Sequence, residues 1–94
     1  MKTGIELIKE ERLRQISEEG WTPEHDDKHA FEEMAIAASC YATPEILKDY
    51  KQGVPKNWPW DKEWYKPTPE NRVRELTKAG ALIAAEIDRL QRLK

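Results

Sequence analysis

The chain has 94 residues, 38% of them hydrophobic and 36% charged, with a formal net charge of −2 at pH 7. Four Trp, three Tyr and one Phe supply large apolar side chains, so the composition favours a folded domain over a disordered chain. The slightly acidic balance argues against a general nucleic-acid binder. No apolar run approaches the roughly 20 residues that cross a bilayer. We therefore expect one domain over residues 1–94 and no membrane partner.

The single cysteine, Cys40, allows no internal disulfide, which is typical of a reducing compartment. The first residues lead into a charged segment and do not have the pattern of a signal peptide, so we expect a cytoplasmic protein. A chain of this length hides only roughly 60 to 65% of its unfolded surface, which makes the core thin. We expect that a homo-oligomer completes it.

Helix-start signals divide the chain into an all-α fold. Thr-Pro-Glu triplets occur at residues 22–24, 43–45 and 68–70, with Thr as a typical N-cap and Pro suited to the first helical position. A further start at Thr3 has capping-box spacing to Glu6. The resulting prediction is three long helices, over residues 4–19, from between 22 and 27 to about 41, and over 69–93, and one short helix over 44–51.

The segment over residues 53–67 is predicted to be irregular. It holds three Pro and three Trp, with room for one turn over residues 61–65. No segment shows the alternation of Val, Ile and Thr that marks strands, so no sheet is predicted.

Two helical segments, over residues 35–42 and 79–85, carry small or apolar residues on every side. Such segments are buried on more than one side, and we expect them to pack against each other. The first helix or a second subunit would then cover them from outside. Gly80 costs a helix about 1 kcal/mol relative to Ala, which indicates a close backbone approach at this position.

An acidic cluster with a histidine opens the second predicted helix. On one continuous helix Asp26, His29 and Glu33 would lie within about 60° of one another. If the two small-residue segments pack antiparallel, Glu33 lies level with Glu86. Several carboxylates together suit Mg²⁺ or Mn²⁺, and we predict a metal site of Asp26, Glu33 and Glu86.

A structural interpretation of the same residues stays open. The acids at 26 and 27 would stabilise a helix N-terminus, and His29 would be an ordinary surface residue. Glu86 would form an ion pair with Arg89 or Arg92.

The tryptophan-rich segment also has two interpretations. Four aromatic residues lie within eight positions, beside lysines, and a base stacks on such rings while Lys62 or Lys66 meets a phosphate. Alternatively, the rings pin an irregular loop to the core. A long irregular loop in a compact domain is often functional, so both interpretations are kept.

Several motifs together resemble a group of small phage- and prophage-encoded proteins of unassigned role, over nearly the whole chain. They are Glu11-Arg12, Arg14-Gln15-Ile16, Gly20-Trp21-Thr22, Glu24-His25-Asp26-Asp27-Lys28-His29, Trp58-Pro59-Trp60, Trp64 with Lys66-Pro67, and Lys78-Ala79-Gly80-Ala81-Leu82-Ile83. The helical layout and carboxylate-rich helices are similar to the all-α NTP pyrophosphohydrolases of the MazG-like kind. Those are Mg²⁺-dependent enzymes that cleave between the α- and β-phosphates of nucleotides, as dimers or tetramers.

This resemblance implies a metal-dependent nucleotide pyrophosphohydrolase or a non-catalytic relative. Mg²⁺ or Mn²⁺ held by the three carboxylates would polarise phosphoryl oxygens and activate a water. His29 or Glu75 would orient that water. The remaining predicted site residues are those that neutralise phosphate, Lys66, Arg72 and Lys78, and those that stack on the base, Trp58, Trp60 and Trp64.

The match to the enzymes is incomplete. They carry Glu-x-x-Glu on one helix and Glu-x-x-Asp on the next, whereas His29 and Lys78 stand here where acids are expected. The alternative function is therefore a phage-encoded helical adaptor that binds a host or phage protein without catalysis.

Overall fold

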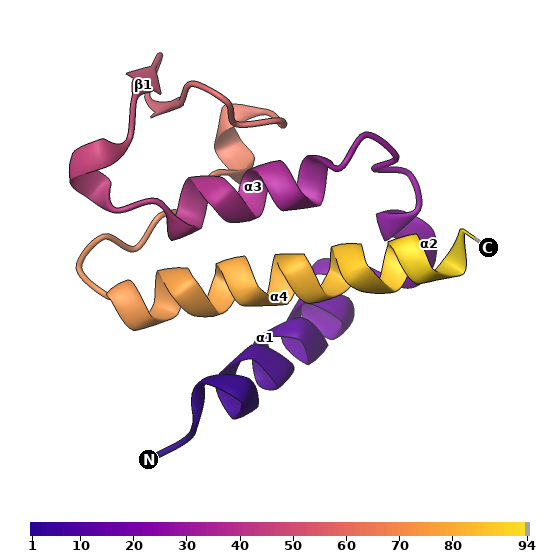
Figure 1. Ribbon diagram of the computed structural model, residues 1–94. Coiled ribbons are helices and arrows are strands. Elements are labelled where there is room, and N and C mark those ends of the chain that lie inside the picture. The colour runs from indigo at the N-terminus through magenta and orange to yellow at the C-terminus, as the bar shows by residue number, and fades with distance from the viewer. Residues whose placement is uncertain (94) are drawn as a thin grey trace.

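The computed structural model describes residues 1–93 and is mostly helical (Figure 1). None of its described helices is both long and apolar enough to cross a membrane. The all-α prediction is confirmed in outline, with one small sheet added. The elements are α1 (Gly4–Glu19), α2 (Pro23–Asp26), α3 (Glu33–Ala42), 3₁₀ turns over Glu45–Leu47 and Lys62–Trp64, β1 (Tyr50–Lys51), β2 (Val54–Pro55) and α4 (Arg72–Arg92).

Helix α1 begins and ends where the sequence predicts. Thr3 Oγ1 accepts a hydrogen bond from the backbone N–H of Glu6 at 3.2 Å, and Glu6 Oε1 accepts one from the N–H of Thr3 at 2.8 Å. This capping box satisfies donors that the first turn of a helix leaves free. Gly20 ends the helix with a φ of 72°, in the left-handed region where glycine is not strained.

The second predicted helix is divided in two, and its prediction as one continuous element is wrong. Helix α2 is a single turn, capped by Thr22 Oγ1, which accepts from the N–H of His25 at 3.3 Å. The chain leaves the helix over residues 27–32, where Glu32 takes a left-handed φ of 62°. The reason is tertiary: Asp26 is anchored to α1, whereas α3 packs along α4. One straight helix cannot make both contacts.

The segment between α3 and α4 is less helical than predicted. Instead of a helix over residues 44–51, a 3₁₀ turn leads into β1, which pairs antiparallel with β2. The prediction of no sheet is therefore wrong, although each strand has only two residues. Gly53, with a φ of 86°, lies in the tight turn between them. The turn predicted over residues 61–65 is confirmed as the 3₁₀ turn Lys62–Trp64.

Helix α4 begins at Arg72, later than the predicted start at Pro69. Asn71 Oδ1 accepts a hydrogen bond from the N–H of Arg74 at 3.1 Å and is the N-cap. Residues 68–71 form a turn in which the N–H of Asn71 donates to the carbonyl oxygen of Thr68 at 2.8 Å. Only the first Thr-Pro-Glu triplet therefore starts an α-helix.

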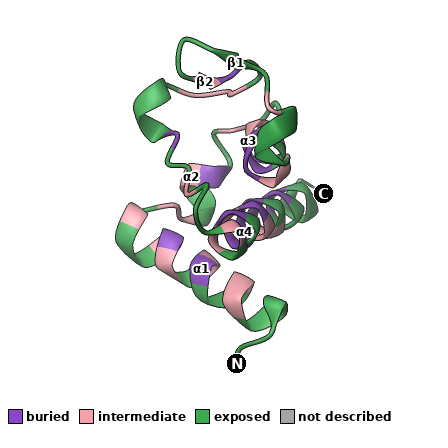
Figure 2. Cartoon of the chain, turned by 90° about the vertical axis from the view of Figure 1, so that its left-hand side faces the viewer, coloured by how far each residue is buried: buried purple, intermediate pink, exposed green. Residues whose placement is uncertain are grey.

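Helix α4 is the central element. Helix α3 lies along one side of α4 and runs antiparallel to it, while α1 crosses another side at an angle (Figures 1 and 2). The prediction that the two small-residue segments pack together is confirmed. The buried cluster that they form with aromatic neighbours contains Met34, Ala37, Ala38, Tyr41, Tyr65, Ala79, Leu82 and Ala85.

The close approach predicted at Gly80 is also confirmed, and the neighbour is α1. A Cβ added to Gly80 would lie 2.5 Å from Ile8 Cδ1 and 2.7 Å from Ile8 Cγ1. Because no side chain stands in the way, Ile8 packs directly over the backbone of α4. This contact brings the polar face of α1 against the first half of α4, where the candidate site lies.

Candidate ligand-binding site

The three carboxylates predicted to bind a metal are engaged with different partners. Asp26 is fully buried and accepts a hydrogen bond from Arg12 Nη2 at 2.6 Å. Glu86 is buried and accepts from Arg89 Nε at 2.7 Å and from Arg89 Nη2 at 2.9 Å. The pair of Glu86 with Arg89 is the structural interpretation that the sequence left open for Glu86.

Glu33 has a third set of partners. Its Oε1 accepts from the backbone N–H of Phe31 at 2.7 Å, and its Oε2 lies 3.7 Å from Nδ1 of His29. Within residues 1–93 no group of three or more His, Cys, Asp or Glu side chains is arranged to hold a metal ion. The side chains of Asp26, Glu33 and Glu86 therefore do not fit a shared Mg²⁺ or Mn²⁺ ion.

Glu75 and Arg72 form contacts between structural elements of the fold. Arg72 donates to the backbone carbonyl oxygens of Tyr41 at 2.8 Å and of Ala42, at the end of α3. It also lies 3.3 Å from Oε1 of Glu75. The other oxygen of that buried carboxylate accepts from the N–H of Thr68 at 3.1 Å. These contacts join α3, α4 and the preceding turn, and neither residue lines the pockets described below.

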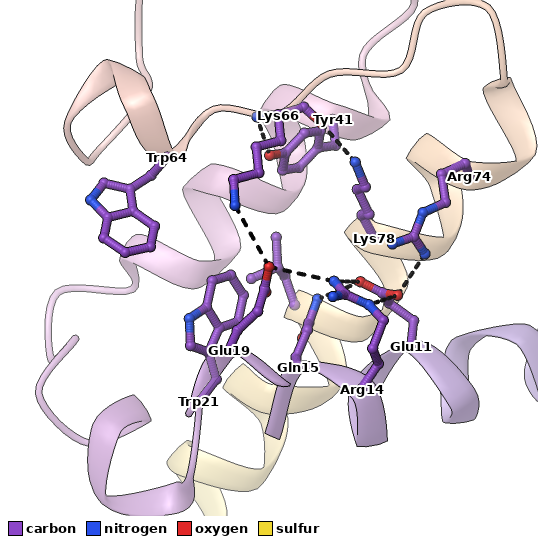
Figure 3. Close-up of a pocket in the computed structure, with 11 residues that line it drawn as sticks. Glu11, Arg14, Gln15, Glu19, Trp21, Tyr41, Trp64, Lys66, Arg74 and Lys78 are labelled. Atoms are coloured by element: carbon purple, nitrogen blue, oxygen red, sulfur yellow. Dashed lines mark hydrogen bonds and ion pairs between the residues drawn. The ribbon is translucent and has the colours of Figure 1, made fainter. Parts of the chain in front are cut away.

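A cationic pocket lies between α1, the end of α3 and the first half of α4 (Figure 3). It has a cavity volume of about 250 Å³. Four of its residues are cations and two are carboxylates, so positive charge is in excess. The lining is Glu11, Arg14, Gln15, Glu19, Trp21, Tyr41, Trp64, Lys66, Arg74, Lys78 and Leu82.

Glu11 is the buried anchor of this cationic pocket. Its carboxylate accepts from Arg14 Nε at 2.9 Å, from Arg14 Nη2 at 2.8 Å and from Arg74 Nη1 at 2.5 Å. Burial alone would raise the pKa of Glu11, but the hydrogen bonds and charges of the two arginines outweigh it and lower the pKa. One carboxylate therefore holds two guanidinium groups from different helices in fixed positions.

Lys78 has no such counter-ion. Its Nζ donates to the backbone carbonyl oxygen of Lys66 at 2.6 Å and lies 5.5 Å from the ring centroid of Tyr41. Among the described residues no carboxylate is within 4.0 Å of this ammonium. Burial, together with the charge of Arg74, lowers the pKa of Lys78. A half-buried cation without a counter-ion favours a bound anion, because the anion offsets its desolvation.

Gln15 lies at the base of the same pocket and is 2% exposed. Its Nε2 donates to Glu11 Oε2 at 3.3 Å. Its Oε1 is buried and accepts no hydrogen bond from any of residues 1–93. Buried polar atoms without a partner are rare in folded proteins, and each calls for a specific explanation.

An aromatic pocket of about 550 Å³ adjoins the cationic pocket and shares Glu19, Trp21 and Trp64 with it. The ring of Trp21 stacks on that of His25, with centroids 5.9 Å apart and an angle of 4°. The full lining is Glu19, Trp21, His25, His29, Pro59, Trp60, Asp61 and Trp64.

His29 and Trp60 lie side by side in the lining of the aromatic pocket, and each ring contains nitrogen. Their ring centroids are 5.0 Å apart. Burial, and then the neighbouring His25, lower the pKa of His29, so its imidazole is neutral at pH 7. The indole N–H of Trp60 is buried and finds no acceptor within the described part of the chain. A flat, largely apolar ligand with an acceptor atom matches these walls.

The structure brings some predicted site residues together and separates others. Lys66, Lys78 and Trp64 meet in the cationic pocket, and His29, Trp60 and Trp64 in the aromatic one. Trp58 instead packs against the core, and its Nε1 donates to the carbonyl oxygen of Asp61 at 3.1 Å. The predicted residues outside both pockets are Asp26, Glu33, Trp58, Arg72, Glu75 and Glu86.

Sequence reasoning did not assign the residues of α1 to a site. Glu11, Gln15 and Glu19 recur every four positions and so lie on one helix face, and Arg74 and Lys78 have the same spacing on α4. That spacing is the signal that could have identified two polar faces, although not their meeting. No protein-family model, no curated protein and no solved structure matches this chain.

Proposed function

We propose that this protein binds a nucleotide, with the base in the aromatic pocket and the phosphates in the cationic pocket. The observation that carries the proposal is that Lys78, a half-buried cation with no carboxylate partner among residues 1–93, lines a cavity that adjoins stacked aromatic rings. An anion joined to a flat ring system satisfies both features at once.

The charges support the phosphate end of this proposal. Arg14 also contacts Glu18 at 3.5 Å and Glu19 at 3.6 Å. Arg74 pairs only with Glu11 among the described residues, through one nitrogen, so its guanidinium keeps donors for a ligand. Lys66 lies 3.9 Å from Glu19, a long contact beside the ring of Trp64. Arginines bind phosphate oxygens in pairs of hydrogen bonds, and lysines bind them as point charges.

The rings support the base end. Stacking on an aromatic side chain contributes about 1 to 3 kcal/mol per base and tolerates any base. Trp21 lines both pockets, so a base that stacks on the ring of Trp21 lies next to the cationic pocket. Trp64 is 52% exposed and adds a second ring at the boundary of the pockets.

The experiment is a calorimetric titration with nucleoside mono-, di- and triphosphates and with the matching nucleosides. We expect binding that requires phosphate and that Lys78→Gln weakens about tenfold, as for a lost charge-assisted hydrogen bond. Lys9→Gln, which removes an exposed lysine of α1 outside both pockets, is the matched control. If no nucleotide gives a heat of binding or raises the melting temperature, the proposal is overturned.

Hydrolysis is a separate part of the proposal and rests on the resemblance to the pyrophosphohydrolases. The same samples, incubated with NTPs and dNTPs plus Mg²⁺ or Mn²⁺, are assayed for released pyrophosphate. Turnover that Lys78→Gln reduces and Lys9→Gln leaves unchanged supports an enzyme. Binding without turnover supports the non-catalytic relative. An oligonucleotide that binds more tightly than any mononucleotide contradicts both.

A second candidate function, self-association, is favoured by one face of α4. Five large apolar residues on it are 46–62% exposed, and their spacing is that of a coiled-coil seam with a repeat of seven. The residues are Val73, Leu76, Ile83, Ile87 and Leu90. At the remaining position of the repeat, Gly80, Ile8 of α1 covers the stripe, so its exposed residues lie on either side of that crossing. We propose that a second copy of this chain covers the part formed by Ile83, Ile87 and Leu90, because two copies related by a two-fold axis present the same apolar residues to each other.

Sedimentation equilibrium tests this face. We expect a dimer, and a monomer when Ile83→Lys and Ile87→Lys are combined. Ile46→Lys, at a position 91% exposed and outside the stripe on α4, is the matched control and should leave the dimer intact. If the wild-type protein is a monomer at all concentrations, the proposal of a second copy on this face is overturned. The face would then be available to bind a different protein, as the adaptor alternative requires.

A further inference from the structure

Gln15 is a buried amide whose oxygen accepts no hydrogen bond from the part of the chain that the structure describes. Burying such an acceptor costs free energy, because it has lost hydrogen bonds to water and gained none from the protein. The residue lies on α1 between Glu11 and Glu19, with one helical turn on either side, and projects toward the cationic pocket (Figure 3).

The orientation of this amide follows from its neighbour. Glu11 Oε2, 3.3 Å from Nε2 of Gln15, is an acceptor with no proton to give. Turning the amide over would place two oxygens against each other. The oxygen of Gln15 is therefore the atom left for a ligand, and the ligand must bring an N–H or O–H donor.

The surroundings restrict that donor to a neutral group. Arg14, Lys66, Arg74 and Lys78 line the same pocket, so a cationic amine would be repelled. The amino groups of a stacked base lie in the aromatic pocket, and Gln15 does not line it. Between a base and its phosphates, a nucleotide carries its sugar, whose hydroxyls are neutral donors.

We propose that Gln15 Oε1 accepts a hydrogen bond from a sugar hydroxyl and makes this a site for nucleotides with a free hydroxyl on the sugar. This inference rests on the proposed nucleotide binding and adds to it the part of the ligand that Gln15 selects. A site built to hydrogen-bond a hydroxyl discriminates strongly against analogues that lack it, since its own polar atom is then left unpaired.

The test compares three triphosphates with one base: the ribonucleotide, the 2′-deoxynucleotide and the 2′,3′-dideoxynucleotide. We expect the wild-type protein to bind the dideoxy compound about tenfold more weakly than the tightest of the three. The 2′-deoxy compound shows whether the 2′- or the 3′-hydroxyl is bound. This comparison needs no variant, so it stands even if a substitution impairs folding.

The variant is Gln15→Met, which keeps the length of the side chain and removes both the unpaired oxygen and the weak Nε2 donor to Glu11, whose carboxylate keeps its two arginine partners. We expect it to bind all three compounds equally, at the level of the dideoxy compound, while its melting temperature is not lowered. A purely structural glutamine would lower stability and leave the preference for the hydroxyl unchanged. Gln91→Met, at an exposed position of α4, is the matched control and should behave as wild type.

The outcomes separate the two proposals. If the wild type binds the three triphosphates with equal affinity, or if Gln15→Met keeps the wild-type preference, the role of Gln15 is overturned and nucleotide binding stands. If no nucleotide binds, both proposals are overturned.

Discussion

Arg12 and Asp26 form an ion pair that joins the first helix to the turn after it, with the Asp26 side chain fully buried and that of Arg12 12% exposed. Arg12 Nη2 donates to Asp26 Oδ2 at 2.6 Å, and Arg12 Nη1 donates to the backbone carbonyl oxygen of Trp21 at 3.2 Å. The other carboxylate oxygen of Asp26 lies 3.3 Å from His25 Nδ1. One guanidinium thus positions the segment that carries Trp21 and His25, the stacked pair of the aromatic pocket.

Asp26→Ala is expected to destabilise the protein by roughly 3 kcal/mol, because it removes a fully buried carboxylate and leaves the part-buried guanidinium of Arg12 without its counter-ion. Urea unfolding measures the change. Asp27→Ala is the control: it removes the adjacent carboxylate, which pairs with Arg92 at the surface, 2.7 Å away, and should change stability little. Equal effects of the two substitutions would contradict the assignment of Asp26 as the anchor.

Gly80→Ala is expected to bring no gain in stability, although alanine improves helix propensity by about 1 kcal/mol. The added Cβ would lie 2.5 Å from Ile8 Cδ1, so Ile8 must move. In an Ile8→Ala background the obstruction is gone, and the same substitution should stabilise by about 1 kcal/mol. A double-mutant cycle measured by urea unfolding reports this coupling. Additive effects would show that α1 does not approach Gly80 closely.

Nucleotide affinity is expected to fall as pH rises through the pKa of Lys78. Burial and Arg74 already lower that pKa from its ordinary value of 10.5, and a bound phosphate favours the protonated form. At a pH above the pKa of Lys78 in the free protein, nucleotide binding therefore requires Lys78 to take up a proton. The nucleotide affinity falls as the pH rises further. Calorimetry between about pH 7 and pH 10 measures the slope. Lys78→Arg, charged throughout, should flatten it, and an unchanged slope would place the titrating group elsewhere.

Binding of a nucleoside monophosphate is expected to survive EDTA, because the groups proposed to meet the phosphate are side-chain cations. If the metal site predicted from the sequence held the nucleotide, the opposite result would be expected. EDTA would abolish nucleotide binding, and Glu33→Ala would abolish both Mn²⁺ binding and nucleotide binding. Calorimetric titrations with Mn²⁺ and with the nucleotide, each with and without the substitution, decide between them. A loss of both in Glu33→Ala would restore the carboxylate site.

Elements whose boundaries depend on residues a few positions apart could be predicted from the sequence. The capping box of Thr3 and Glu6 and the left-handed Gly20 involve residues a few positions apart, so α1 has the predicted bounds. The two small-residue segments predicted the α3–α4 contact, because helices that are small on every side have few other ways to be buried. Local signals failed where a distant partner competed with them. Asp26, held by α1, is separated from Glu33 by the break after α2.

Which polar faces meet could not be predicted from the sequence, because it depends on how distant helices pack. Glu11, Gln15 and Glu19 share one face of α1, and Arg74 and Lys78 share one face of α4, but their spacing does not say what lies opposite. Packing at Gly80 sets how closely the two helices approach, and the ion pair between Glu11 and Arg74 joins their polar faces. The cationic pocket exists only because α1 and α4 approach each other in this way. It depends on the balance of contacts over the whole chain, which no single segment contains.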